Sequence, residues 1–289
     1  MSVRDIQEHI QSLYGAEISP STISSITNKV IEEANEWHSR ILKSLYAVVY
    51  FDAVHFKVRE DGVIITKAVY SCYGITSQVD REILGLWIGE REGAKFWLGV
   101  CADLQQRGVK DILIACMDGL KGLPEAIERM FPQVSIQLCV VHQIRNSLKY
   151  IPTNRYKEFL SDLKSVYQAP SEKVAREKLN TLEEKWGGKY PHAVASWVNN
   201  WDRICTYFQY PAVLRKLIYT TNAVEALNRQ MRKVTKAKGA LPTKGSLFKM
   251  LYLAVRDIDA KRKRVNGWKE IFSSLAIIFG DRVTSIECA

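Results

Sequence analysis

The chain has 289 residues, 47% of them hydrophobic, which is enough to bury one large core or two small ones. Its 41 lysines and arginines outweigh 31 aspartates and glutamates, and the net charge of +10 favours a polyanionic partner such as nucleic acid. No apolar run approaches the roughly 18 residues that span a bilayer, and the charged amino-terminal residues are unlike a secretory signal. We therefore expect a cytoplasmic protein with no membrane partner.

The amino-terminal residues have the pattern of two helices. Apolar residues recur at helical spacing from residue 3 to residue 14, and a second helix is predicted after Ser19. Residues 1–40 therefore predict a helix-turn-helix for DNA binding, whose second helix would offer Ser21 and Thr22 to phosphates and base edges in a major groove. An ordinary helical hairpin would give the same pattern.

Strand patterns begin near residue 44. Three strands are predicted first, followed by alternating helices and strands, which indicates a mixed α/β sheet whose later strands are parallel. The predicted strands are 46–58, 63–75, 82–89, 111–118 and 134–141, and the predicted helices are 92–106 and 121–131.

The remaining sequence is predicted to be helical. From residue 143 to about 216 the pattern is helical throughout, and we expect residues 151–216 to form an all-helical insertion. Helices restart near residue 220 and again over 247–258. Residues 44–150 and 217–289 would then be the two parts of one interrupted core.

Two aspartates lie where a predicted strand could present them to a ligand. Asp52 lies in mid-strand among apolar neighbours, where a carboxylate costs several kcal/mol to desolvate unless a cation or donors meet it. Asp118 ends the predicted strand 111–118, and ligands gather at the carboxyl ends of strands in open α/β sheets. Each has a structural alternative. Asp52 would be a strand-end or bulge residue bonded to backbone, and Asp118 a helix cap or turn residue.

A third acid, Glu225, is predicted to lie on a helix with a basic face. Arg229, Arg232 and Lys236 follow it at spacings of four, three and four, so all four residues share one face, where cations could bind phosphates. Asn222 and Glu225 also match a capping box, and a solvated charged face would have the same spacing.

Taken together, the three acids suggest a site for two divalent ions. Two Mg²⁺ ions about 3.5–4 Å apart serve an in-line phosphoryl displacement, and oxygen-only ligands suit this hard cation. The hypothesis assigns Asp52, Asp118 and Glu225 as both catalytic residues and metal ligands, with Mn²⁺ as a substitute ion.

The pair Cys139 and His142 follows the last predicted strand. If strands 111–118 and 134–141 are parallel neighbours, His142 lies at the same sheet edge as Asp118 and could contact a phosphate. The chain has no second ligand pair with the spacing of a structural zinc site, so Cys139 is interpreted as core. Arg145 and Lys149 continue on the next helix and either hold the DNA backbone or form a solvated face.

Several segments carry a family resemblance. They are FDAVHFKVRED around Asp52, ILIACMDGLKGLPEAIE around Asp118, IQLCVVHQIRNSLKY with Cys139 and His142, YTTNAVEALNRQMRK around Glu225, and SVRDIQEHIQSLYG at the start. Together they cover nearly the whole chain, which resembles Mutator-type transposases of bacterial insertion sequences.

The resemblance implies a ribonuclease-H-like fold with a helical insertion between the second Asp and the Glu, and a catalytic Asp-Asp-Glu triad. It implies an enzyme that first hydrolyses DNA at the element's ends and then directs the freed 3′ hydroxyl onto target DNA. Its partners would be the terminal inverted repeats and the target duplex, and we expect a homo-oligomer when it is assembled on DNA.

One feature departs from the family pattern. Members usually carry a longer amino-terminal region that binds the inverted repeats, whereas Met1 here falls just before the predicted helix-turn-helix. We interpret the shorter amino-terminal region as that of a truncated copy, a fragment or a late-start product. Two alternatives to a transposase also stand: a non-catalytic DNA-binding protein or inactive remnant, and a nuclease that does not join DNA.

Overall fold

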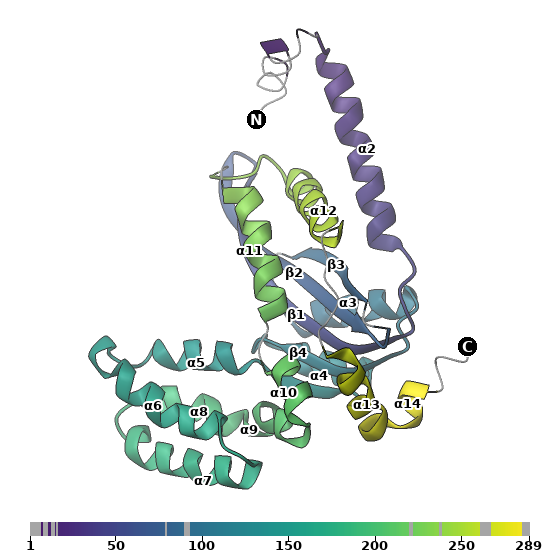
Figure 1. Cartoon of the computed structure of the whole chain (residues 1–289). Coiled ribbons are helices and arrows are strands. Elements are labelled where there is room, and N and C mark those ends of the chain that lie inside the picture. The colour runs from purple at the N-terminus through teal and green to yellow at the C-terminus, as the bar shows by residue number, and fades with distance from the viewer. Residues whose placement is uncertain are drawn as a thin grey trace.

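A five-stranded sheet with helices around it forms the described part of the molecule (Figure 1). The computed structural model describes residues 7, 11–12, 15, 17–78, 80–89, 93–219, 222–236, 239–260 and 267–284. The strands are β1 (Leu45–Glu60), β2 (Val63–Thr76), β3 (Arg81–Gly89), β4 (Asp111–Met117) and β5 (Ser135–Leu138).

The helices of the first half of the chain are α2 (Pro20–Ser39), α3 (Ala94–Gln106), α4 (Leu123–Met130) and α5 (Val140–Leu148). The helices and helical turns that follow are η1 (Thr153–Arg155), α6 (Tyr156–Tyr167), α7 (Glu172–Leu182), η2 (Glu183–Gly187), α8 (Pro191–Asn199), α9 (Trp201–Ile204), η3 (Cys205–Gln209), α10 (Ala212–Ile218), α11 (Asn222–Lys236), α12 (Lys244–Ala260), α13 (Trp268–Phe279) and α14 (Asp281–Thr284).

The sheet is mixed, with strand order β3-β2-β1-β4-β5. β1, β2 and β3 are antiparallel neighbours, whereas β4 runs parallel to β1 and β5 parallel to β4. The hairpin between β1 and β2 turns at Asp61 and Gly62, whose φ angles of 49° and 81° match the right-handed twist of the strands. The predicted mixed sheet with parallel later strands is confirmed.

Helices cover both faces of the sheet at β1. Phe51 meets Trp97 of α3 edge to face, with ring centroids 6.5 Å apart, so α3 covers one face. On the other face, the Tyr50 hydroxyl donates a hydrogen bond of 2.7 Å to the carbonyl oxygen of Leu217 in α10. Alternate residues of a strand share a face, so Asp52 points to the side of the sheet that Tyr50 faces.

Helices α5 to α9 form a lobe to one side of the sheet (Figure 1). The lobe has its own aromatic packing, since Trp186 meets Phe159 edge to face and Trp197 is fully buried. The prediction of helix from residue 143 to 216 is confirmed by these elements. That residues 151–216 form a separate insertion stays a prediction, as do the other domain boundaries.

Two predicted elements differ from the structure or extend beyond its described part. The last strand ends at Leu138 rather than at residue 141, because α5 already begins at Val140 with Cys139 as its cap residue. The predicted second amino-terminal helix is α2, capped by Ser19, but most of the first lies outside the described residues. The helix-turn-helix therefore stays a prediction.

Among the described residues, none of the helices combines the length and the apolar character needed to cross a membrane.

Candidate active site

Strand register brings Asp52 and Asp118 next to each other. Phe51 of β1 pairs with Met117 of β4 in the parallel ladder, so the next residue along each strand is an aspartate at the same level of the sheet. Asp52 is only 6% exposed, whereas the Asp118 side chain, just beyond the end of β4, is 28% exposed. A buried and a half-buried carboxylate thus lie side by side at the C-terminal end of β4.

Hydrogen bonds hold both aspartates in place. The backbone N–H of Ala53 donates to Oδ1 of Asp52 at 2.8 Å, and the Asn228 amide of α11 donates to Oδ2. Asp118 accepts from the backbone N–H of Gly119 at 2.7 Å. The bonds from backbone N–H groups are those expected if both aspartates had only a structural role in a strand or a turn. Each carboxylate nevertheless keeps lone pairs for a further ligand. Burial raises the pKa of Asp52, and the bond from Ala53 lowers it in part.

His142 completes a group of three that could hold a metal ion. The backbone N–H of Cys139 donates to the carbonyl oxygen of Met117 at 2.8 Å, which starts α5 beside Asp118. One ligand atom each from Asp52, Asp118 and His142 lie within 4.8 Å of one another. Burial acts to lower the pKa of His142, but its hydrogen bond with Cys139 and the nearby negative charges raise this pKa to about 9.

Glu225 of α11 lines the same space. Its Oε1 accepts a hydrogen bond of 2.7 Å from Nη1 of Arg145 on α5. Asp52, Asp118 and Glu225 all line one cavity of about 220 Å³. The structure thus brings the three predicted acids together, with Glu225 paired to an arginine across the cavity. Their catalytic role stays a prediction.

The predicted phosphate-binding residues divide into two groups. His142, Arg145, Arg229 and Arg232 line the cavity that holds the three acids. Lys149 is exposed outside it, and its ammonium group donates to the Asn146 side chain at 2.7 Å.

The other three predicted DNA contacts lie elsewhere. Ser21 and Thr22 are exposed in the first turn of α2, at the end that projects away from the sheet (Figure 1). The Lys236 side chain lies outside the described residues, although its backbone ends α11. DNA contact by any of these residues stays a prediction.

Sequence reasoning missed two features of this cavity. The first is Asn228, which is 3% exposed and bonds Asp52 from α11. Its position three residues after Glu225 was the available signal, because residues three apart are neighbours on a helix. The second is the pairing of Arg145 with Glu225, which joins residues 80 apart in sequence and left no local signal.

Comparison with known proteins identifies the family of the chain. The family model described as "Transposase, Mutator family" matches residues 1–264. The chain belongs to the Mutator family of transposases.

Relatives in several bacteria share most of the chain. A transposase for the insertion sequence element ISRM3 of Rhizobium meliloti is 42% identical over 98% of this chain and 71% of the relative. A probable insertion-sequence transposase of Corynebacterium diphtheriae is 39% identical over 98% of this chain and 88% of its own length. The transposase for IS256 in transposon Tn4001 of Staphylococcus aureus is 29% identical over 92% of this chain and 70% of the relative.

Proposed function

We propose that this Mutator-family transposase cleaves DNA at the ends of its element and transfers the freed strands to target DNA by means of Asp52, Asp118 and Glu225. The observation that carries the proposal is the meeting of these three acids around one cavity, from β1, the end of β4 and α11. Each acid comes from a different part of the sequence, so no local structural need explains their convergence.

We assign a ribonuclease-H-like fold to the catalytic core. Three antiparallel strands followed by two parallel ones support it, with the two aspartates on adjacent strands β1 and β4. The helices of the lobe lie between Asp118 and Glu225 in sequence, as the family resemblance implies. Residues 44–150 and 217–289 would form the core, 151–216 the insertion and 1–40 a DNA-binding helix-turn-helix.

The cavity suits a hard divalent cation such as Mg²⁺ or Mn²⁺. Asp52 and Asp118 would hold it through carboxylate oxygens, with the His142 imidazole in reach and Glu225 on the far side. When bound, the ions activate the attacking oxygen and stabilise the leaving oxygen of a phosphodiester. The chain itself contributes the cations Arg145, Arg229 and Arg232, which offer hydrogen bonds to phosphate oxygens.

The first step would be hydrolysis of a phosphodiester at an element end, which breaks the P–O bond to the 3′ oxygen and leaves a 3′ hydroxyl. In the second step that hydroxyl would attack a phosphorus of target DNA, and the target's own 3′ oxygen would leave. Because the two steps are both displacements at phosphorus, one cavity can serve them in turn.

We further propose that double-stranded DNA is the partner and that the protein acts in the cytoplasm. The net charge of +10 supports a polyanionic partner. We propose a homo-oligomer on DNA, since an insertion sequence has two ends to cut.

The decisive experiment compares Glu225→Gln and Asp118→Asn with the unaltered protein in Mg²⁺-dependent cleavage of DNA that carries the element's terminal repeats. Each variant is expected to lose at least about a thousandfold in rate, or about 4 kcal/mol of transition-state stabilisation. The glutamine keeps an oxygen that can accept from Arg145 or close a capping box, so a purely structural role would survive.

Glu177→Gln is the matched control, because Glu177 is exposed on α7 in the lobe and far from the cavity in sequence and fold. It should cleave normally. Near-normal cleavage by Glu225→Gln would remove Glu225 from the site. Cleaved ends that are never joined to target DNA would indicate a nuclease, and no cleavage by the unaltered chain would favour an inactive, DNA-binding remnant.

A further inference from the structure

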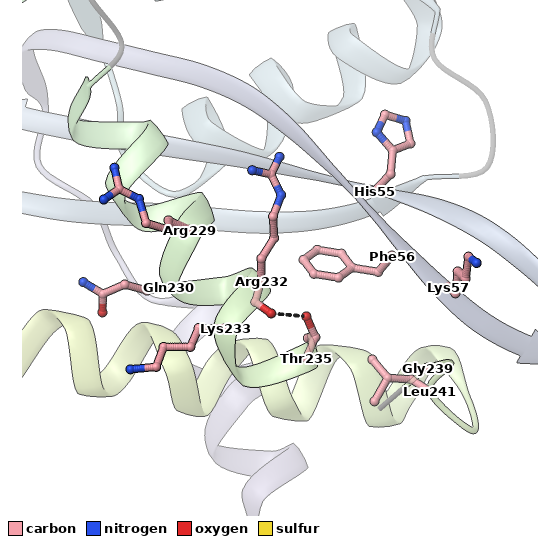
Figure 2. Close-up of a pocket in the computed structure, with 10 residues that line it drawn as sticks. All are labelled: His55, Phe56, Lys57, Arg229, Gln230, Arg232, Lys233, Thr235, Gly239 and Leu241. Carbon is pink, nitrogen blue, oxygen red and sulfur yellow. Dashed lines mark hydrogen bonds between the residues drawn. The ribbon is translucent and has the colours of Figure 1, made fainter. Parts of the chain in front are cut away.

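A second, larger cavity lies between β1 and α11 (Figure 2). It shares Arg229 and Arg232 with the catalytic one. Its volume is about 670 Å³, within the usual range of small-molecule sites. Its lining comes from the middle of β1, from α11 and from the segment that leads to α12. We call it the β1–α11 groove.

The floor of the groove is apolar and fixed in place. Phe56 of β1 is 6% exposed, and its ring lies between the strand and α11 (Figure 2). Leu241 is anchored beside it, because its N–H donates to the carbonyl oxygen of Lys57 at 2.9 Å and its own carbonyl oxygen accepts from Arg59 at 2.8 Å. Thr235 turns its hydroxyl away to the carbonyl oxygen of Arg232. The floor therefore offers the accessible part of the Phe56 ring and apolar groups of Leu241 and Thr235 rather than polar atoms.

The rim of the groove is cationic. Lys57, Arg229, Arg232 and Lys233 all line it with exposed side chains, and among the described residues that line it there is no aspartate or glutamate. In Figure 2 the Arg232 side chain lies between those of Arg229 and Phe56. An anionic ligand with a flat apolar part fits both the rim and the floor.

The groove adjoins the catalytic cavity. Arg229 and Arg232 line both spaces, so a phosphate chain could pass from one to the other along α11. Along β1 the distance from Asp52 to Phe56 is about 13 Å, or four residues of strand. A few nucleotides of one DNA strand are long enough to span the distance from Asp52 to Phe56.

We propose that the β1–α11 groove binds unpaired nucleotides of the DNA strand whose phosphate lies in the catalytic cavity. The bases would lie against Phe56, and their phosphates would contact the rim cations. A duplex presents phosphates, sugars and base edges but hides its base faces in the stack, which would leave the apolar floor without a flat partner. Single-strand sites combine a basic groove with aromatic stacking in this way. The identity of the strand rests on the proposed function.

The test measures binding to fluorescein-labelled oligothymidine of about twelve nucleotides, within the footprint of single-strand sites, and to an abasic oligonucleotide of equal length. EDTA is present throughout, so cleavage plays no part, and this test and the cleavage test can fail independently. Anisotropy titrations over a range of salt concentrations give affinity and salt slope. The unaltered protein should bind oligothymidine about tenfold more tightly than the abasic chain.

Phe56→Leu should lose this preference for bases, while Phe56→Tyr, which restores an aromatic face, should keep it. Lys233→Ala should reduce the salt slope by about 0.7, the value for one phosphate contact on a single strand, and leave the preference unchanged. Lys178→Ala, an exposed lysine of α7, is the matched control and should change neither quantity.

Equal binding of the two oligonucleotides by the unaltered protein would overturn the proposal, as would a Phe56→Leu variant that still prefers bases tenfold. If Phe56→Leu melts without a cooperative transition, the preference of the unaltered protein for oligothymidine and the salt slope of Lys233→Ala decide the matter. An unchanged salt slope in Lys233→Ala would remove the rim from the site.

Discussion

Two buried polar groups in the helical lobe and two in the cavity lined by the three acids differ in what they contribute to stability. In the lobe, the Trp197 indole N–H donates to the hydroxyl of Ser147, which itself donates to a carbonyl oxygen. In the cavity, burial raises the pKa of Asp52, and Oδ1 of Asn228 meets no hydrogen-bond donor among the described residues. The Trp197–Ser147 pair thus stabilises the fold of the lobe, while the Asp52 carboxylate and the Asn228 oxygen cost stability in the cavity.

Asp52→Asn should separate activity from stability most strongly. Cleavage should fall at least about a thousandfold, since an amide is a poor ligand for the divalent ions. The melting temperature should stay the same or rise, because the buried carboxylate that is lost was costly to desolvate. Cleavage of terminal-repeat DNA measures the loss of activity, and thermal melting measures the change in stability. A large fall in melting temperature would mean that Asp52 serves the fold.

Trp197→Ala should give the opposite result. The fully buried indole fills the space between α8 and α5, so its removal should cost about 3–5 kcal/mol of unfolding free energy. Trp197→Phe, which keeps most of the volume but loses the N–H donor to Ser147, should cost about 1 kcal/mol. Chemical denaturation measures both. Cleavage per folded molecule should remain normal, and a selective loss of cleavage would tie the lobe to catalysis.

Asp162→Asn should have the smallest effect, and one that depends on pH. Burial acts to raise the pKa of Asp162. Hydrogen bonds from Lys185 and Trp186 lower this pKa by more than burial raises it, so the net shift is downward. The charged form therefore stabilises the fold above the unfolded-state pKa of about 3.9, and this contribution is lost as pH falls through the lower folded-state pKa.

Thermal melts of Asp162→Asn and the unaltered chain should accordingly differ a little at neutral pH and converge in strong acid. The asparagine can still accept the Trp186 N–H bond, so the comparison isolates the charge. A difference that persists unchanged in acid would show that the charge of Asp162 contributes nothing.

The sheet could be predicted well because its cues are local. Alternating β-rich segments and the turn at Asp61 and Gly62 located the hairpin of β1 and β2. The end of β5 could not be predicted, since CVV is apolar and β-branched yet begins α5 after Cys139. There the packing of the helix against its neighbours overrides strand propensity.

The residues of the cavity were predicted in large part, since the three acids and the predicted phosphate-binding residues His142, Arg145, Arg229 and Arg232 all line it. Asp52 and Asp118 were singled out by their places in predicted strands, but their proximity depends on the parallel pairing of β1 with β4, which the sequence pattern did not predict. The bond from Asn228 and the Arg145–Glu225 pair depend on how α11 and α5 pack across the sheet edge, which no spacing encodes. The β1–α11 groove likewise forms between segments that lie far apart in the chain.

The most direct test of the central claim is to locate Mn²⁺ by its anomalous scattering in crystals of the protein with terminal-repeat DNA. We expect two peaks about 3.5–4 Å apart, bound by Asp52, Asp118 and Glu225, with Arg145 released from Glu225. Peaks absent from this cavity, or a Glu225 that stays paired with Arg145 while DNA is cleaved in the crystal, would contradict it.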